Sequence, residues 1–224
     1  MAAAADSFEA WLAQAQLPGH RLRPDQHALL QAAFATSETE RASLSTTEQN
    51  NAAILAFGIA VGQPNIARLI RLKTDPVLVQ NAVAISRGTT LNGRADWPRH
   101  FAVSAALAVI GHPIVSDAGG LMKEQLDSLT RGSGFSFGDL AADRAGIRFA
   151  LSATRSNAAA ASMQTRLQGA FTQKDFFPLE VRFPEDLSVE EFRQKYGNVG
   201  SERYRSTVSD IDAALERCSA LSSH

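Results

Sequence analysis

The segments RADWPRHFAVSAALAV (Arg94 to Val109) and GGLMKEQLDSLTRGSGFSFGDLAADRAGIRFA (Gly119 to Ala150) form the most informative part of the sequence. Both place ionisable side chains at helical spacing among small and apolar residues. Charged groups are rarely buried in such surroundings unless they are paired, hydrogen-bonded or bound to metal. We therefore expect these helices to lie in the core and to share one polar site. Its candidate members are Asp96, His100, Glu124, Asp127, Asp139 and Asp143.

Signals for the starts and ends of helices recur along the whole chain. The segments Ser45 to Glu48 and Ser188 to Glu191 are capping boxes, and prolines at 64 and 76 suit the first turn of a helix. No segment shows convincing strand alternation. The sequence predicts an all-α protein, a single-domain irregular bundle of about nine or ten helices. The polar site is expected on the helices at about 96–111, 115–130 and 138–153.

The domain organisation follows from the same reading. We expect residues 1–175 to form a helical core domain that contains the motif region 96–150. Residues 176–224 are expected to form a C-terminal helical appendage packed on that core.

Composition excludes several classes of function. The 224 residues carry a net charge of −1 with scattered Lys and Arg, so nucleic acid is not an expected partner. The single cysteine, Cys218, forbids a disulfide within the chain and is expected to be structural. No apolar run reaches the roughly 18 to 20 residues that span a bilayer. The N-terminal residues lack the features of a signal peptide, which predicts a cytoplasmic protein, or a periplasmic or envelope-associated one if a signal segment has been removed.

The spacing of the first polar groups suggests pairs on single helices. Asp96 and His100 lie four residues apart, so the carboxylate is expected to orient the imidazole, unless Asp96 only caps the helix. Glu124 and Asp127, beside Lys123, lie three apart on the next helix. Their alternative is a solvated face, with Asp127 paired to an arginine one turn later.

Asp139 and Asp143 lie four residues apart on a stripe that is otherwise small and apolar. Like charges at this spacing repel unless a cation, a proton or a histidinium lies between them. The alternative is that Asp139 belongs to a cap begun by Ser136, and that Asp143 pairs with Arg144 or with the arginine one turn further on.

These residues allow three kinds of site. A divalent metal (Mn, Fe, Mg or Zn) would be bound by His100, Glu124, Asp139 and Asp143, since oxygen-rich ligands with one imidazole suit these ions. An acid–base site would use Glu124, His100 and Asp143 as catalytic residues. A structural network would include the remaining polar residues, Asp96, Lys123, Asp127, Ser136 and Arg144. The sequence contains no HExxH motif.

The order of these motifs resembles that of a known family. The element DWPRHF, from Asp96 to Phe101, is similar to the D-K-x-x-H-F element of the YfiM-like lipoproteins and, more remotely, of VanZ-like proteins. The elements GLMKEQLD, from Gly120 to Asp127, and GFSFGDLAADRAG, from Gly134 to Gly146, resemble the two that follow there. The resemblance covers about a quarter of the chain, and Trp97 replaces the usual lysine. It implies a relative in the bacterial cell envelope that does not span the membrane.

We therefore expect an envelope-associated helical protein whose buried His/carboxylate site serves ligand binding or structural integrity, with a small molecule or envelope component as partner. The first alternative is a metal-dependent or acid–base hydrolase. In it Glu124 or Asp143 activates water, His100 is a ligand or proton shuttle, and Asp139 orients it. The second is a protein-interaction scaffold with an exposed apolar patch on the C-terminal segment, formed by Phe176, Phe177, Phe183 and Phe192.

Overall fold

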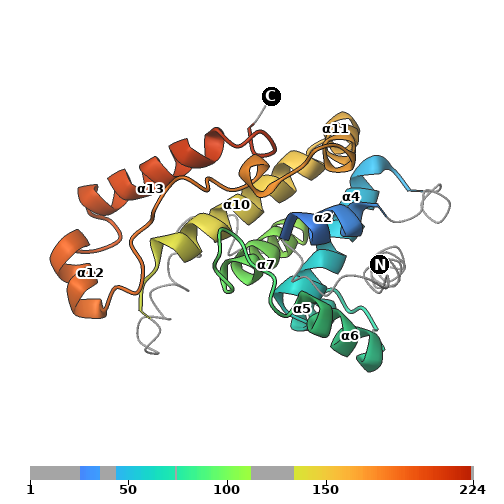
Figure 1. Cartoon of the computed structure of the whole chain (residues 1–224), viewed down its shortest axis with the longest axis horizontal. Coiled ribbons are helices and arrows are strands. Elements are labelled where there is room, and N and C mark those ends of the chain that lie inside the picture. Colours follow the sequence, from blue (N-terminus) through green and yellow to red (C-terminus); the bar gives the residue numbers. More distant parts are fainter. Residues whose placement is uncertain (1–25, 36–43, 74, 112–133, 223–224) are drawn as a thin grey trace.

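A computed structural model describes residues 26–35, 44–73, 75–111 and 134–222 of the chain (Figure 1). Within these ranges it contains nine α-helices and no strand, which confirms the predicted all-α bundle. A π-helix at Gly58–Gly62 continues α4, and a 3-10 turn covers Gln173–Asp175. The α-helices are α2 (Gln26–Phe34), α4 (Thr46–Phe57), α5 (Asn65–Leu69), α6 (Pro76–Ser86), α7 (Trp97–Val109), α10 (Phe137–Thr154), α11 (Asn157–Gln168), α12 (Val189–Tyr196) and α13 (Glu202–Glu216).

The packing of α7 against α10 organises the molecule. Figure 1 shows α10 running through the centre, with α7 along one side and α13 along the other. A Cβ at Gly146 would lie 2.2 Å from the carbonyl oxygen of Phe101, so only a glycine allows the two backbones to come this close. Because α7 and α10 touch along this line, the first turns of both helices also lie side by side.

The opposite side of α7 packs against the π-helix. A Cβ at Gly58 would lie 2.5 Å from the Cβ of Ala106, so small residues again allow close approach. Helix α7 is thus enclosed on two sides, and Phe101 in its middle is fully buried. The polar residues of α7 that reach solvent are therefore confined to a narrow strip.

The predicted helix caps are confirmed where they are described. The Ser45 and Ser188 side chains each accept a hydrogen bond from the third residue of their helix, and the glutamate at that position bonds back to the serine. Ser136 caps α10 by accepting from the backbone N–H of Asp139 at 2.9 Å. Local sequence signals thus fixed the starts of these helices.

The C-terminal segment packs into the same core as the helices before it. Phe176 and Phe177 are fully buried, against the rings of Phe101 (5.3 Å between centroids) and Trp97 (5.1 Å) respectively. Phe192 is also buried. The exposed patch that the scaffold alternative requires does not form, because three of its four phenylalanines fill the core of the described residues.

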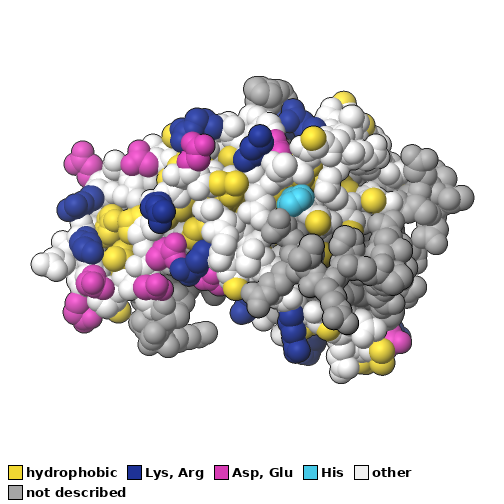
Figure 2. Space-filling model, in the orientation of Figure 1, with side chains coloured by type: hydrophobic (Ala, Val, Ile, Leu, Met, Phe, Trp, Pro, Cys, Tyr) yellow, Lys and Arg dark blue, Asp and Glu magenta, His cyan; other side chains and the backbone are white. Residues whose placement is uncertain are grey.

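The surface carries charges of both signs. Figure 2 shows acidic and basic side chains interspersed over the end of the molecule where α12 and α13 lie, without a field of one sign. Of the helices described, none is both long enough and apolar enough to cross a membrane.

Candidate functional site

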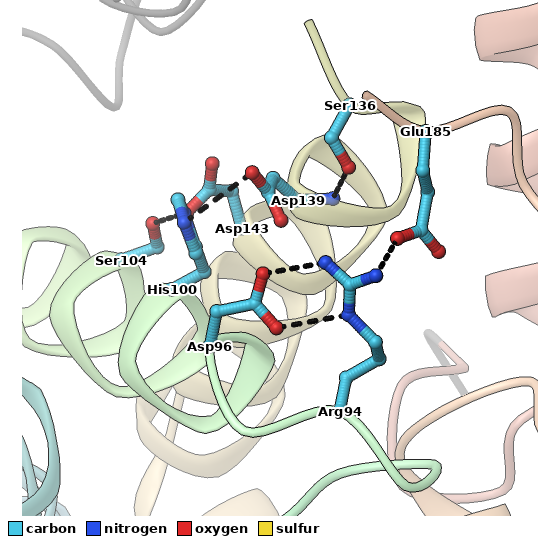
Figure 3. A network of polar contacts seen from close by, with 8 residues as sticks. All are labelled: Arg94, Asp96, His100, Ser104, Ser136, Asp139, Asp143 and Glu185. Atoms are coloured by element: carbon cyan, nitrogen blue, oxygen red, sulfur yellow. Dashed lines mark hydrogen bonds and ion pairs between the residues drawn. The ribbon is translucent and has the colours of Figure 1, made fainter. Parts of the chain in front are cut away.

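The site is a histidine on α7 held between two aspartates on α10 (Figure 3). The Nδ1 atom of His100 lies 3.3 Å from Oδ1 of Asp143, and Nε2 lies 3.6 Å from Oδ2 of Asp139. Asp139 and Asp143 are one helical turn apart, so both carboxylates face the same ring. This is the arrangement predicted for two like charges at this spacing, with a histidine between them.

Asp143 is the buried anchor of the cluster. The residue is 6% exposed, and its Oδ1 atom also accepts a hydrogen bond of 2.8 Å from the hydroxyl of Ser104. Ser104 follows His100 by one turn on the same face of α7. Two donors from α7 thus converge on one carboxylate oxygen of α10, and they fix the two helices in register.

Asp139 is less completely satisfied. Its Oδ1 atom is buried and has no hydrogen-bond partner in the part of the chain that the structure describes. Burial raises the pKa of this carboxyl, the nearby His100 lowers it, and Asp96 and Asp143 raise it further. A buried carboxylate oxygen without a donor is unfavourable, so Asp139 binds a proton more readily than an ordinary aspartate.

His100 carries a proton at neutral pH. Burial disfavours its charge, but the hydrogen bond to Asp143 and the charges of Asp143, Asp139 and Asp96 outweigh that effect and raise its pKa to about 9. The side chain keeps 36% of its surface exposed. Both ring nitrogens then bear hydrogen and face a carboxylate, so the ring acts as a cation between two anions.

Asp96 does not orient His100 as the sequence suggested. Its carboxylate instead binds the guanidinium of Arg94 with two hydrogen bonds of 3.0 and 2.7 Å, and this pairing lowers its pKa. Asp96 occupies the N-cap position of α7, but its side chain makes no capping bond. Arg94 also contacts Glu185, which connects α7 to the segment before α12. For Asp96, the bidentate Arg94 is a stronger partner than His100, and it lies nearer in the chain.

Arg144 is not the partner of Asp143. It forms two hydrogen bonds with Asp212 of α13, and Arg148 contacts the same carboxylate at 3.0 Å. The prediction that either arginine pairs with Asp143 is therefore wrong. Both lie on the face of α10 that turns toward α13, whereas Asp143 turns toward α7.

Three of the predicted site residues, Lys123, Glu124 and Asp127, lie outside the described residues. The proposed four-residue metal site therefore stays a prediction. In the ranges that the structure describes, no group of three or more His, Cys, Asp or Glu side chains is arranged to hold a metal ion. A metal at His100 would first have to displace the proton that the two aspartates hold there.

Sequence reasoning did not assign Arg94 and Glu185 to this region. Arg94 stands two residues before Asp96, so a local ion pair could have been expected. Glu185 lies far along the chain, and only the fold brings it to Arg94.

The single cysteine, Cys218, is buried, in agreement with the structural role expected for it. Burial raises the pKa of its thiol to about 11, which favours the unreactive protonated form.

Comparison with known proteins does not extend this picture. No protein-family model matches the chain, and no curated protein or solved structure matches it either.

Proposed function

We propose that the His100 cluster is a proton-dependent clamp that holds α7 to α10 in a non-catalytic protein of the bacterial cell envelope. The observation that carries the clamp is the position of the ring, with one carboxylate of α10 at each nitrogen. A general base needs a ring nitrogen with a free lone pair, and a protonated imidazole has none. The same cation neutralises one of two like charges that would otherwise repel.

The envelope location belongs to the proposal. It is supported by the resemblance of the segments 96–101 and 134–146 to the lipoprotein motifs, whose histidine and last two aspartates correspond to His100, Asp139 and Asp143. A role in structural integrity also agrees with Ser104, because its hydroxyl donates a hydrogen bond to Asp143 within the protein. These groups bind one another and leave few donors for a substrate.

The clamp predicts a specific dependence of stability on pH. His100 has a pKa of about 9 in the folded protein and an ordinary value of 6.5 when unfolded. Its contribution is therefore fully present below about pH 6.5 and is lost as the pH rises through about 9. We expect His100→Gln to lower the free energy of unfolding by about 1 to 2 kcal/mol at pH 6.5, less than the full shift implies because the side chain is partly exposed.

The measurement is urea unfolding of wild type and His100→Gln between pH 6 and 10. The matched control is Arg99→Gln, which removes an exposed positive charge from the neighbouring position of α7. We expect the stability difference between wild type and His100→Gln to shrink as the pH rises from about 6.5 to about 9 and to vanish above that, while Arg99→Gln follows wild type. Parallel curves for wild type and His100→Gln would refute the clamp.

One observation favours a second candidate, an acid–base hydrolase centred on Asp139. Its Oδ1 atom has no hydrogen-bond partner among the described residues, and burial raises its pKa, so Asp139 takes up a proton more readily than an ordinary aspartate, as a general acid must. The test is hydrolysis of p-nitrophenyl acetate and bis-p-nitrophenyl phosphate by wild type and Asp139→Asn. Activity that Asp139→Asn abolishes and Arg99→Gln keeps would support it, and no activity in wild type would count against it.

A further inference from the structure

The described residues enclose a pocket of about 560 Å³ where α10 and α13 end, apart from the His100 cluster. Its volume lies within the range of small-molecule sites, roughly 300 to 1,000 Å³. Two side chains on its wall, Leu151 and Glu216, are 56% and 68% exposed, so the pocket opens to solvent. A ligand could enter it without displacing a helix.

The polar wall is dominated by two guanidinium groups. Arg148 is 25% exposed and is held by Asp212, with one Nη2 to Oδ1 distance of 3.0 Å. Its other terminal nitrogen, Nη1, lies 3.8 Å from the carboxylate of the exposed Glu216, which is too long for a hydrogen bond and leaves room for a better acceptor. Arg155 lies on the same wall, together with the hydroxyl-bearing Ser152 and Ser222. Fixed guanidinium donors recognise carboxylate and phosphate groups.

The rest of the lining is apolar. Leu151 is one of the few large apolar side chains of the described residues that is exposed, and it faces this pocket together with Leu221. An exposed leucine is ordinary by itself. An exposed leucine beside two arginines in a cavity provides both contacts that a molecule with a charged head and an apolar body needs.

From these features we infer that the pocket binds a small organic anion, a carboxylate or phosphate monoester that bears a short apolar chain. The arginines bind the head, and the leucines cover the chain. Arg144 and Arg148 share the carboxylate of Asp212, so together with Arg155 and Glu216 this region carries three positive and two negative charges, and an anion is favoured over a cation. The inference goes beyond the clamp and uses none of its residues, so either proposal can fail alone.

The test is calorimetric titration of the full chain with hexanoate, hexyl phosphate and hexylammonium. We expect saturable binding of one or both anions and none of the cation, and the two anions together tell which head group is preferred. Arg155→Gln should weaken anion binding about tenfold, the loss of roughly one charge-assisted hydrogen bond. Leu151→Asn should weaken hexanoate more than acetate. Both sites are exposed, so neither change should unfold the protein.

The matched control is Arg205→Gln, which removes an equal charge from α13 outside the pocket and should leave binding unchanged. Three results would overturn the inference. These are no saturable anion binding up to about 10 mM, ten times a Kd of about 1 mM; equal binding of hexylammonium; or unchanged binding by both pocket variants.

Discussion

The ring of His100 has a carboxylate at each nitrogen, and this decides what the residue can do. A histidine with one free nitrogen shuttles protons, whereas one with both nitrogens on anions stores a positive charge. The spacing of Asp139 and Asp143 indicated that a cation, a proton or a histidinium lies between them unless each has another role. It could not reveal that Asp96 would turn away to Arg94, because the choice between two nearby partners depends on side-chain geometry and not on spacing.

At the residue scale, a substitution of Ser104 measures how much the second hydrogen bond to Asp143, beside that of His100, contributes to stability. We expect Ser104→Ala to lower the free energy of unfolding by about 1 kcal/mol, because the buried Oδ1 of Asp143 loses a hydrogen bond of 2.8 Å. The measurement is urea unfolding at pH 7. Ser206→Ala, at an exposed position of α13, is the control and should change stability by less than about 0.5 kcal/mol. Equal effects of the two changes would contradict a special role for Ser104.

At the element scale, helix starts were predictable, and helix contacts were predictable only where polar groups indicated them. A capping serine and its glutamate lie three residues apart, so Ser45 and Ser188 could be recognised from the sequence alone. The π-helix after α4 and the pairing of α10 with α13 depend on groups far apart in the chain. The polar residues predicted that the helices now called α7 and α10 share a site, but the sequence did not indicate that Gly146 lets the backbone of α10 approach that of α7 at Phe101.

The close contact of α7 and α10 makes a prediction of its own. We expect Gly146→Ala to destabilise the protein by about 2 to 3 kcal/mol, since the added Cβ would meet the backbone of Phe101 and the helices would have to separate. Gly169→Ala is the comparison, because its Cβ would meet no atom closer than 3.4 Å. Thermal unfolding followed by circular dichroism measures both. A Gly146→Ala protein as stable as wild type would show that the helices are not pressed together.

At the scale of the whole molecule, the described core is continuous from α2 to the residues after α13. The predicted domain boundary lies between Asp175, which ends the 3-10 turn, and the buried Phe176 and Phe177. Hydrophobic spacing alone did not separate a core phenylalanine from an exposed one, because both follow the same pattern. Burial depends on what the rest of the fold brings against the ring.

The continuity of the core can be tested at Phe176. We expect Phe176→Ala to lower the free energy of unfolding by about 3 to 5 kcal/mol, since the ring is fully buried against Phe101 and Phe171. Phe183→Ala, at a half-buried position, should cost less. Urea unfolding should remain a single transition in both. A second transition in Phe176→Ala would instead indicate that the C-terminal segment unfolds as a separate unit.

The central claim is that His100 is a cation held by Asp139 and Asp143. The most direct measurement is an NMR titration of its imidazole, assigned among the five histidines by the signal that His100→Gln removes. We predict a pKa of about 9 in wild type and a lower pKa in Asp139→Asn, which removes one of the two anions. A wild-type pKa at or below the ordinary 6.5 would contradict the clamp and favour a histidine that is neutral and free to act as a base.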